Sequence, residues 1–172
     1  MEHAIDIQVE ATRKLGLRTV LTRGSMSLGE DQGGLPPRHT IQTEQAIIDD
    51  SLRLIREYHQ PEFGGMTQIA LAPCSPFSVT TELMKETAQL AKANEVMLHT
   101  HLCETIDEEN FCLERFAIAR LTIWKRWVGC MTEPGWHTAF ISMMRKLTGS
   151  AKRDWDLPLP QFEHDARLWN LP

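Results

Sequence analysis

The order of hydrophobic and polar positions predicts strands and helices in turn over the first two-thirds of the chain. Residues 4–15 and 43–58 carry apolar side chains at helical spacing, which is typical of helices with one buried side. The apolar side of the second helix comprises Ile47, Ile48, Leu52 and Ile55. Short apolar runs at 18–23, 67–73 and 96–101 predict buried strands, and a polar loop rich in Gly and Pro covers 24–37.

Two further helices are indicated by their start signals. Thr80 can cap a helix that carries Leu83, Met84, Ala88 and Ala91. The segment Thr105-Ile-Asp-Glu108 is a capping box, which predicts a helix over 106–115. Each strand is thus followed by a helix, and this repetition predicts a parallel sheet.

The number of these units limits the fold class. About three β/α units are present, whereas a closed (β/α)8 TIM barrel needs eight of them in about 250 residues. The sequence therefore predicts an α/β fold, either a partial TIM-barrel arc or a small open sheet. Residues 1–116 would form this part, and residues 117–172 an irregular C-terminal tail.

The segment His99-Thr-His101-Leu-Cys-Glu104 is the strongest chemical signal. Side chains alternate along a strand, so His99 and His101 would share a face at its C-terminal end. Two imidazoles and a nearby carboxylate suit a divalent metal with an acid/base group that is not a ligand. The alternative is a strand with one buried, hydrogen-bonded histidine and one exposed histidine.

The loops after the first two strands would lie at the same edge of the sheet. The segment Arg23-Gly-Ser-Met-Ser-Leu-Gly29 could offer hydroxyls, amides and a cation to a polar heterocycle, or could be an ordinary flexible loop. Cys74 and Ser75 follow the second strand in the same way. No partner base can be assigned to Cys74, so a buried or substrate-contacting thiol is favoured over a nucleophile.

Composition excludes several classes of function. The net charge is −5, which disfavours a nucleic-acid partner, and no apolar run approaches the roughly 20 residues that cross a membrane. The N-terminus lacks the pattern of a signal peptide, and the four cysteines form no CxxC pair. Free thiols and a cytoplasmic location are expected.

Three segments together resemble a known family. RGSMSLG with GGLPP, ALAPCSPFSVT with ELM, and LHTHLCET with DEE, FC and ERF occur in order over residues 1 to about 116. They resemble the amidohydrolase superfamily, in particular its cytosine/guanine deaminase and triazine hydrolase branch, and within that branch the 8-oxoguanine deaminases. The resemblance implies a metal-dependent aminohydrolase on a (β/α)8 barrel, which deaminates a purine or a related cyclic amidine such as 8-oxoguanine.

The resemblance also implies roles for single residues. His101 would be a metal ligand and Glu104 the proton shuttle, with His99 a lesser neighbour. The cofactor would be one divalent ion, zinc first and iron as the alternative. A small heterocyclic substrate would lie near Arg23, Ser25, Cys74 and Ser75, and the intact parent would be a homo-oligomer. Guanine deaminases resemble the chain less around Cys74, which argues against guanine itself.

Two parts of the family's metal site are not found in the sequence. A His-x-His motif would lie upstream of Met1, and an aspartate ligand would lie downstream. The chain is therefore expected to be an internal fragment. A metal held by His101 with at most two neighbours would bind weakly, because zinc sites use three or four protein ligands.

The last third of the chain differs in composition from the rest. All five tryptophans follow Phe116. Residues 1–116 hold 10 basic and 18 acidic residues, whereas residues 117–172 hold 8 and 5. An irregular second segment or a basic interaction tail would account for this, but translation out of frame accounts for it better.

The genetic code supports the out-of-frame reading. If each codon starts at the third base of the previous one, residues 136–145 can encode AHGIHFNDE and residues 121–127 can encode DYLEEV. A start at the second base lets residues 157–172 encode CHCPSSSMTLASGIC. These strings resemble later family segments, which predicts frameshifts near residues 116–119 and 153. Two functions remain: an aminohydrolase that inherits its chemistry from His101 and Glu104, or a catalytically inactive truncated product.

Overall fold

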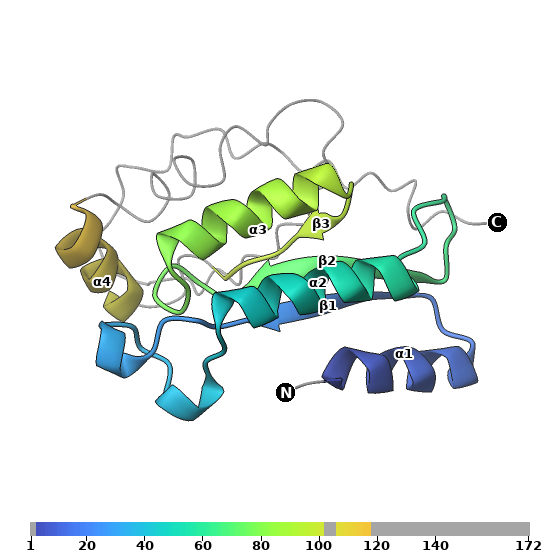
Figure 1. The fold of residues 1–172 in the computed structure, drawn as a ribbon, viewed down its shortest axis with the longest axis horizontal. Coiled ribbons are helices and arrows are strands. Elements are labelled where there is room, and N and C mark those ends of the chain that lie inside the picture. Colours follow the sequence, from blue (N-terminus) through green and yellow to red (C-terminus); the bar gives the residue numbers. More distant parts are fainter. Residues whose placement is uncertain (1–2, 102–105, 118–172) are drawn as a thin grey trace.

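The computed structural model describes residues 3–101 and 106–117 (Figure 1). In order, its elements are α1 (Ala4–Leu15), β1 (Thr19–Ser25), α2 (Glu44–Tyr58), β2 (Thr67–Pro73), α3 (Thr81–Ala93), β3 (Met97–Leu98) and α4 (Ile106–Phe116). Two short 3-10 helices, Glu30–Gln32 and Arg38–Thr40, lie in the loop after β1. The predicted alternation of strands and helices is confirmed. The predicted tail lies outside the described residues except for Ala117, so its frameshift stays a prediction.

The three described strands form one parallel sheet in the order β1-β2-β3. Arg23 of β1 is the register partner of Leu71 in β2, and Leu71 is in turn the partner of Leu98 in β3. Paired residues in a parallel sheet share a face, so these three side chains all point to the same side. Figure 1 shows α2 and α3 lying side by side along the sheet.

The core lies between the sheet and these helices. Leu71 and Leu98 pack there with the fully buried Leu83 and Met84 of α3. The other buried members of this cluster are Ile47, Val79, Ala88, Ala91, Val96 and Cys112. The opposite face of the sheet is less covered, since Val20 of β1 is 51% exposed. The apolar positions expected for α3 are therefore confirmed as core.

Helix α3 starts where the sequence predicted. The Thr80 hydroxyl accepts a hydrogen bond from the Leu83 amide at 3.0 Å, and Thr43 caps α2 in the same way through the Ala46 amide at 3.3 Å. Each cap satisfies one amide that has no partner within its own helix. Helix α4 begins at Ile106, as the sequence predicted, although Thr105 of the capping box lies outside the described residues.

The buried side of α2 differs from the prediction. Ile47, Ser51 and Leu54 are the buried residues, whereas Leu52 and Ile55 are only partly covered. Ser51 is tolerated at the centre because its hydroxyl donates to the carbonyl of Ile47 at 2.6 Å. A small, satisfied residue there lets the helix approach the sheet closely, which the apolar pattern alone did not indicate.

Strand β3 is shorter than the predicted 96–101. The amide of His99 still donates to the Leu71 carbonyl at 2.8 Å, but the amide of His101 donates to Cys74 at 2.8 Å. A regular parallel ladder would instead bring His101 to Pro73, two residues after Leu71. The chain thus departs from the ladder by one residue at this point, while remaining bonded to the end of β2.

Helix α1 is tied to α2 by charged side chains. Arg53 of α2 donates to both carboxylate oxygens of Asp6 at 2.7 and 2.9 Å, and the Tyr58 hydroxyl donates to Asp6 at 2.6 Å. The Arg53 guanidinium holds the pKa of Asp6 well below its usual range, against the opposing effect of burial. Arg53 also pairs with Asp50 at 2.8 Å, so the network continues along α2.

Candidate functional site

The carboxyl ends of the three strands meet through main-chain hydrogen bonds. The Cys74 amide donates to the Ser25 carbonyl at 3.0 Å, and the His101 amide donates to the Cys74 carbonyl at 2.8 Å. Thr100, which is buried, adds a bond from its hydroxyl to the same Cys74 carbonyl at 3.2 Å. The segments that the sequence singled out after each strand are therefore side by side, at the edge where parallel α/β proteins bind their ligands.

His99 and His101 lie against each other at this edge. Their ring centroids are 5.1 Å apart and the rings meet edge to face at 87°. Both side chains are partly buried, so neither half of the alternative with one buried and one exposed histidine is observed. Within residues 3–101 and 106–117, no hydrogen bond engages either ring. The imidazole nitrogens are thus available to a ligand.

The electrostatic surroundings favour the neutral form of His99. Burial lowers the pKa of its imidazole, and the neighbouring His101 lowers it further because two positive charges would repel. A neutral imidazole keeps the nitrogen lone pair that a metal ion requires. The fit to a divalent metal therefore rests on two adjacent imidazoles that have no hydrogen bond within the described residues, with the neutral form favoured in His99.

Arg23 points to the helix side of the sheet. Its side chain is buried on the helix side of the sheet, where Nε donates to Asp50 at 3.0 Å and Nη1 donates to Gln42 at 3.1 Å. Nη1 also donates to the carbonyl of Gly24. Arg23 thus links the end of β1 to α2. Its contact with a substrate stays a prediction.

Cys74 and Ser75 have unequal environments. Ser75 is buried, and its hydroxyl shares a hydrogen bond of 2.7 Å with the hydroxyl of Ser78 in the same loop. Cys74 is partly exposed beside the histidine segment, and its sulfur is not in a disulfide. Of these two predicted substrate-binding residues, Cys74 is the more accessible, and both assignments stay predictions.

The structure also reveals contacts of Glu44, a residue that the sequence did not single out. Glu44, the first residue of α2, accepts hydrogen bonds from the hydroxyls of Ser27 and Thr80. These residues are 17 and 36 positions away from Glu44. No local sequence signal indicates such distant contacts, although Ser27 lies in the loop that the sequence singles out for its hydroxyls.

The predicted proton shuttle Glu104 lies outside the described residues. Among the residues that the structure describes, no group of three or more His, Cys, Asp or Glu side chains could hold a metal ion. A search of the same residues for a helix able to cross a membrane finds none. His101, the predicted metal ligand, and its neighbour His99 lie within the described residues, and the metal-binding role of His101 stays a prediction.

Comparison with known proteins places these features in a family. The model of the amidohydrolase family matches residues 1–127. The chain is 58% identical over 118 residues to an 8-oxoguanine deaminase of Pseudomonas aeruginosa, covering 69% of this chain and 26% of that protein. It is 34% identical over 100 residues to a hydroxydechloroatrazine ethylaminohydrolase of Pseudomonas sp. strain ADP, covering 58% of this chain and 21% of the relative.

Solved structures show the same relationship. The atrazine chlorohydrolase of Arthrobacter aurescens TC1, complexed with zinc, matches with a TM-score of 0.70 and 32% identity, over 73% of this chain and 28% of that one. The three β/α units are accordingly an arc of a (β/α)8 barrel, as predicted. The chain spans about a quarter of the length of these relatives.

Proposed function

The chain belongs to the amidohydrolase family, and from this premise we propose that it carries part of the metal and acid/base site of an aminohydrolase. The reaction is hydrolysis of a carbon–nitrogen bond other than a peptide bond, with a purine or related cyclic amidine such as 8-oxoguanine as substrate. The observation that carries the proposal is the histidine pair, which is bonded to the end of β2 at the carboxyl edge of the sheet.

His101 would bind the metal through its imidazole, with His99 packed edge to face against it. A bound divalent ion, zinc first and iron as the alternative, supplies an activated water at neutral pH. Glu104 would take the proton from that water and deliver protons to the ring nitrogen and the leaving amine. Zinc in the similar chlorohydrolase structure supports the choice of metal.

The substrate would lie over the joined strand ends. Cys74 is partly exposed at this edge and would lie nearest to the heterocycle. Arg23, Ser25 and Ser75 belong to the same edge, but all three are buried. Arg23 and Ser75 already have polar partners within the fold. These two residues would act mainly by fixing the shape of the binding surface.

A second candidate is a catalytically inactive product. It is favoured by the composition change after Phe116, where all five tryptophans are found. A frameshifted tail would replace family segments that contribute further ligands. Sequencing the encoding DNA around the codons for residues 116–119 and 153 tests this candidate, because single-base changes would rejoin the two frames.

The biochemical test uses the purified chain with and without added zinc. Ammonia release from 8-oxoguanine and from a hydroxytriazine, together with bound zinc per chain, would be measured. His101→Ala should lose the zinc, whereas Glu104→Gln should keep it and lower the rate by about 10²–10⁴-fold. His39→Ala is the matched control, because His39 is exposed in the loop after β1. Absence of both zinc and ammonia release in the unchanged chain would favour the inactive product.

A further inference from the structure

The loops after β1 and β2 are joined by a small set of polar side chains, here called the rim cluster: Ser27, Glu44, Ser78 and Thr80. The amides of Ser27 and Leu28 both donate to the Ser78 carbonyl, at 2.9 and 3.1 Å. The Ser27 hydroxyl accepts from the Thr80 amide at 3.3 Å. Ser27 and Ser78 are buried and Thr80 is partly exposed, so these bonds are partly shielded from water.

The same two loops are also joined by the Leu35 amide, which donates to the Phe77 carbonyl at 3.2 Å. The Gln42 amide donates to the Met26 carbonyl at 2.9 Å, and this bond joins the two ends of the loop after β1. Within the first loop, a side-chain carbon added at Gly34 would lie 2.2 Å from the Leu28 carbonyl oxygen, so only glycine fits this close approach. The loop after β1 is therefore a folded unit packed on its neighbour.

Glu44 occupies a distinctive position in the rim cluster. One of its carboxylate oxygens accepts from the Ser27 hydroxyl at 3.4 Å and from the Thr80 hydroxyl. Thr80 in turn caps α3, and Glu44 itself is the first residue of α2. A negative charge is stabilised near the N-terminus of a helix, and here the N-terminal ends of two helices meet at one carboxylate.

We propose that Glu44 is a positioning residue that holds the loops after β1 and β2 together and thereby shapes the substrate side of the site. Glu44 acts through Ser27 and Thr80, and it makes no contact with the histidine pair within the described residues. Its effect on the site is indirect: the Cys74 amide is bonded to the end of β1, and the loop containing Cys74 is held by Ser78. The connection to substrate rests on the proposed function.

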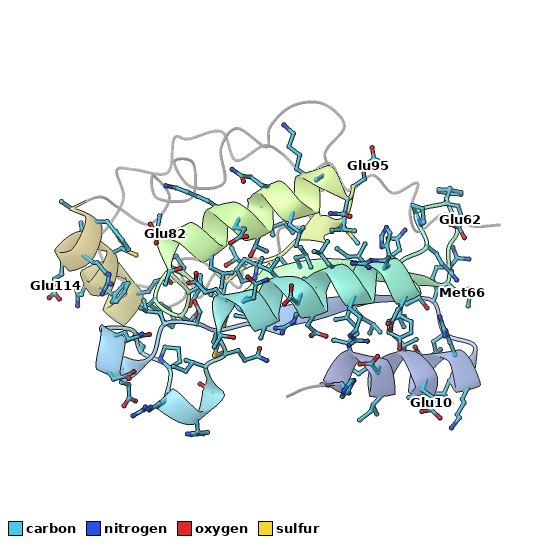
Figure 2. The ribbon with its side chains drawn as sticks, in the orientation of Figure 1. Glu10, Glu62, Met66, Glu82, Glu95 and Glu114 are labelled. Atoms are coloured by element: carbon cyan, nitrogen blue, oxygen red, sulfur yellow. The ribbon has the colours of Figure 1, made fainter. Side chains whose placement is uncertain are left out.

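Hydrogen exchange of the full chain tests this assignment without requiring activity. Glu44→Ala removes a charged acceptor, so amides in residues 26–36 and 75–83 should exchange about tenfold to a hundredfold faster. Glu44→Gln keeps an acceptor oxygen and should restore most of the protection. Glu82→Gln is the matched control, because Glu82 is also in the first turn of a helix but is exposed (Figure 2).

Unchanged exchange in Glu44→Ala would overturn the assignment, as would equal loss of protection in Glu82→Gln. If Glu44→Ala does not fold, Ser27→Ala replaces it, since this change removes a donor to Glu44 and the acceptor of the Thr80 amide. Ser27→Ala should open the same two segments, and unchanged protection would again overturn the assignment.

Kinetics separate this inference from the proposed function. With active protein, Glu44→Ala should raise KM for 8-oxoguanine by about tenfold with a smaller change in kcat, and Glu44→Gln should restore most of it. Faster exchange together with no ammonia release from the unchanged chain would support the loop contact and count against deamination. Ammonia release with unchanged exchange and KM in Glu44→Ala would support deamination and overturn the role of Glu44.

Discussion

The two ends of the sheet are built differently. At the carboxyl end, the loops after β1 and β2 are bonded to each other, and Ser27, Ser75 and Ser78 are buried. At the amino end, the connection from α2 to β2 leaves Phe63 83% exposed, whereas Leu35 is 45% exposed in the loop after β1. Figure 2 shows Met66 and Glu82 at opposite ends of the sheet.

The difference shows at which end the relative positions of the loops are fixed by contacts between them. Contacts at the carboxyl end join residues far apart in sequence, so the position of each loop depends on the others. The amino end is joined by the main-chain bond from the Thr19 amide to the Met66 carbonyl at 2.9 Å. Within its connection from α2 to β2, the side chains of Gln60 and His59 accept from nearby amides. In α/β proteins the carboxyl end holds the ligand, and the amino end contributes mainly to stability.

The largest expected effect concerns the core that supports both ends. Leu71 is 1% exposed between the sheet and α3, so Leu71→Ala should lower the free energy of unfolding by about 2–5 kcal/mol. Val20→Ala, on the less covered face, should cost less than about 1 kcal/mol. Urea unfolding followed by circular dichroism measures both, and equal losses would contradict a one-sided core.

Removal of Arg53 should separate α1 from α2. Arg53 is 29% exposed and Asp6 is 21% exposed, so solvent reduces the energy of their pair. Arg53→Met should lower the free energy of unfolding by about 1–2 kcal/mol, since Asp6 and Asp50 lose their shared partner. In a double-mutant cycle with Asp6→Asn, additive losses would show that the pair contributes nothing.

Substituting two helix caps compares the stability contributed by a cap in the rim cluster with that contributed by an ordinary cap. Thr43→Ala should cost about 1 kcal/mol, because it removes one bond to the start of α2. Thr80→Ala should cost more, because the Thr80 hydroxyl both caps α3 and donates to Glu44. Urea midpoints of the two variants make the comparison, and an equal or smaller loss for Thr80→Ala would count against the rim cluster.

Mild acid should lower the stability of the fold at the amino end of the sheet, because His59 becomes protonated. Its Nδ1 accepts from the Ile69 amide at 3.0 Å, and burial lowers the pKa of the imidazole against the opposing charge of Glu62. The unfolded chain then binds the proton more readily than the folded chain. The contribution of His59 to the free energy of unfolding is therefore complete above pH about 6.5, and it is lost as pH falls toward the pKa of His59 in the folded chain.

The pH dependence can be assigned by variants. Urea midpoints between pH 8 and pH 5 should fall less steeply in His59→Gln than in the unchanged chain. The exposed His39→Gln is the control. His99, whose pKa is also lowered, should account for part of the remaining slope. Identical slopes in all three proteins would rule out a contribution from His59.

The smallest effect is expected for the exposed aromatic residue of the amino end. Phe63→Ser should change the free energy of unfolding by less than about 0.5 kcal/mol. Phe77→Ser should cost clearly more, because the Phe77 ring packs edge to face on Phe111 of α4 with centroids 6.5 Å apart. Thermal unfolding of both variants would show whether the two ends differ as described.

Local signals predicted much of the fold. The bounds of α1 and β2, the Thr80 cap and the buried residues of α3 follow from periodicity and capping, which depend on residues within one or two turns. Alternation along a strand also predicted that His99 and His101 lie together, and they do, although β3 ends at Leu98, before both residues. The resemblance to the amidohydrolase family was also evident from short local segments, and the match of the family model confirms this resemblance.

The candidate site was only partly predictable. His101 and Cys74 could be expected at one edge because parallel strands end together. The assignment of Glu104 is untested because this residue lies outside the described part of the chain. The orientation of Arg23 was not predictable, since the pattern places it in a strand without telling which face meets α2.

The sequence by itself determined the order of elements, their caps and the histidine segment at a strand end, because these depend on neighbours along the chain. Only the tertiary structure decided that Arg23 pairs with Asp50, that Ser51 lies at the centre of the buried side of α2, and that Glu44 joins two loops. The contact of Arg23 with Asp50 joins β1 to α2 within one strand–helix unit, and the contact of Glu44 with Thr80 crosses to the next unit. They depend on how closely helices and strands approach, which chain-local patterns do not encode.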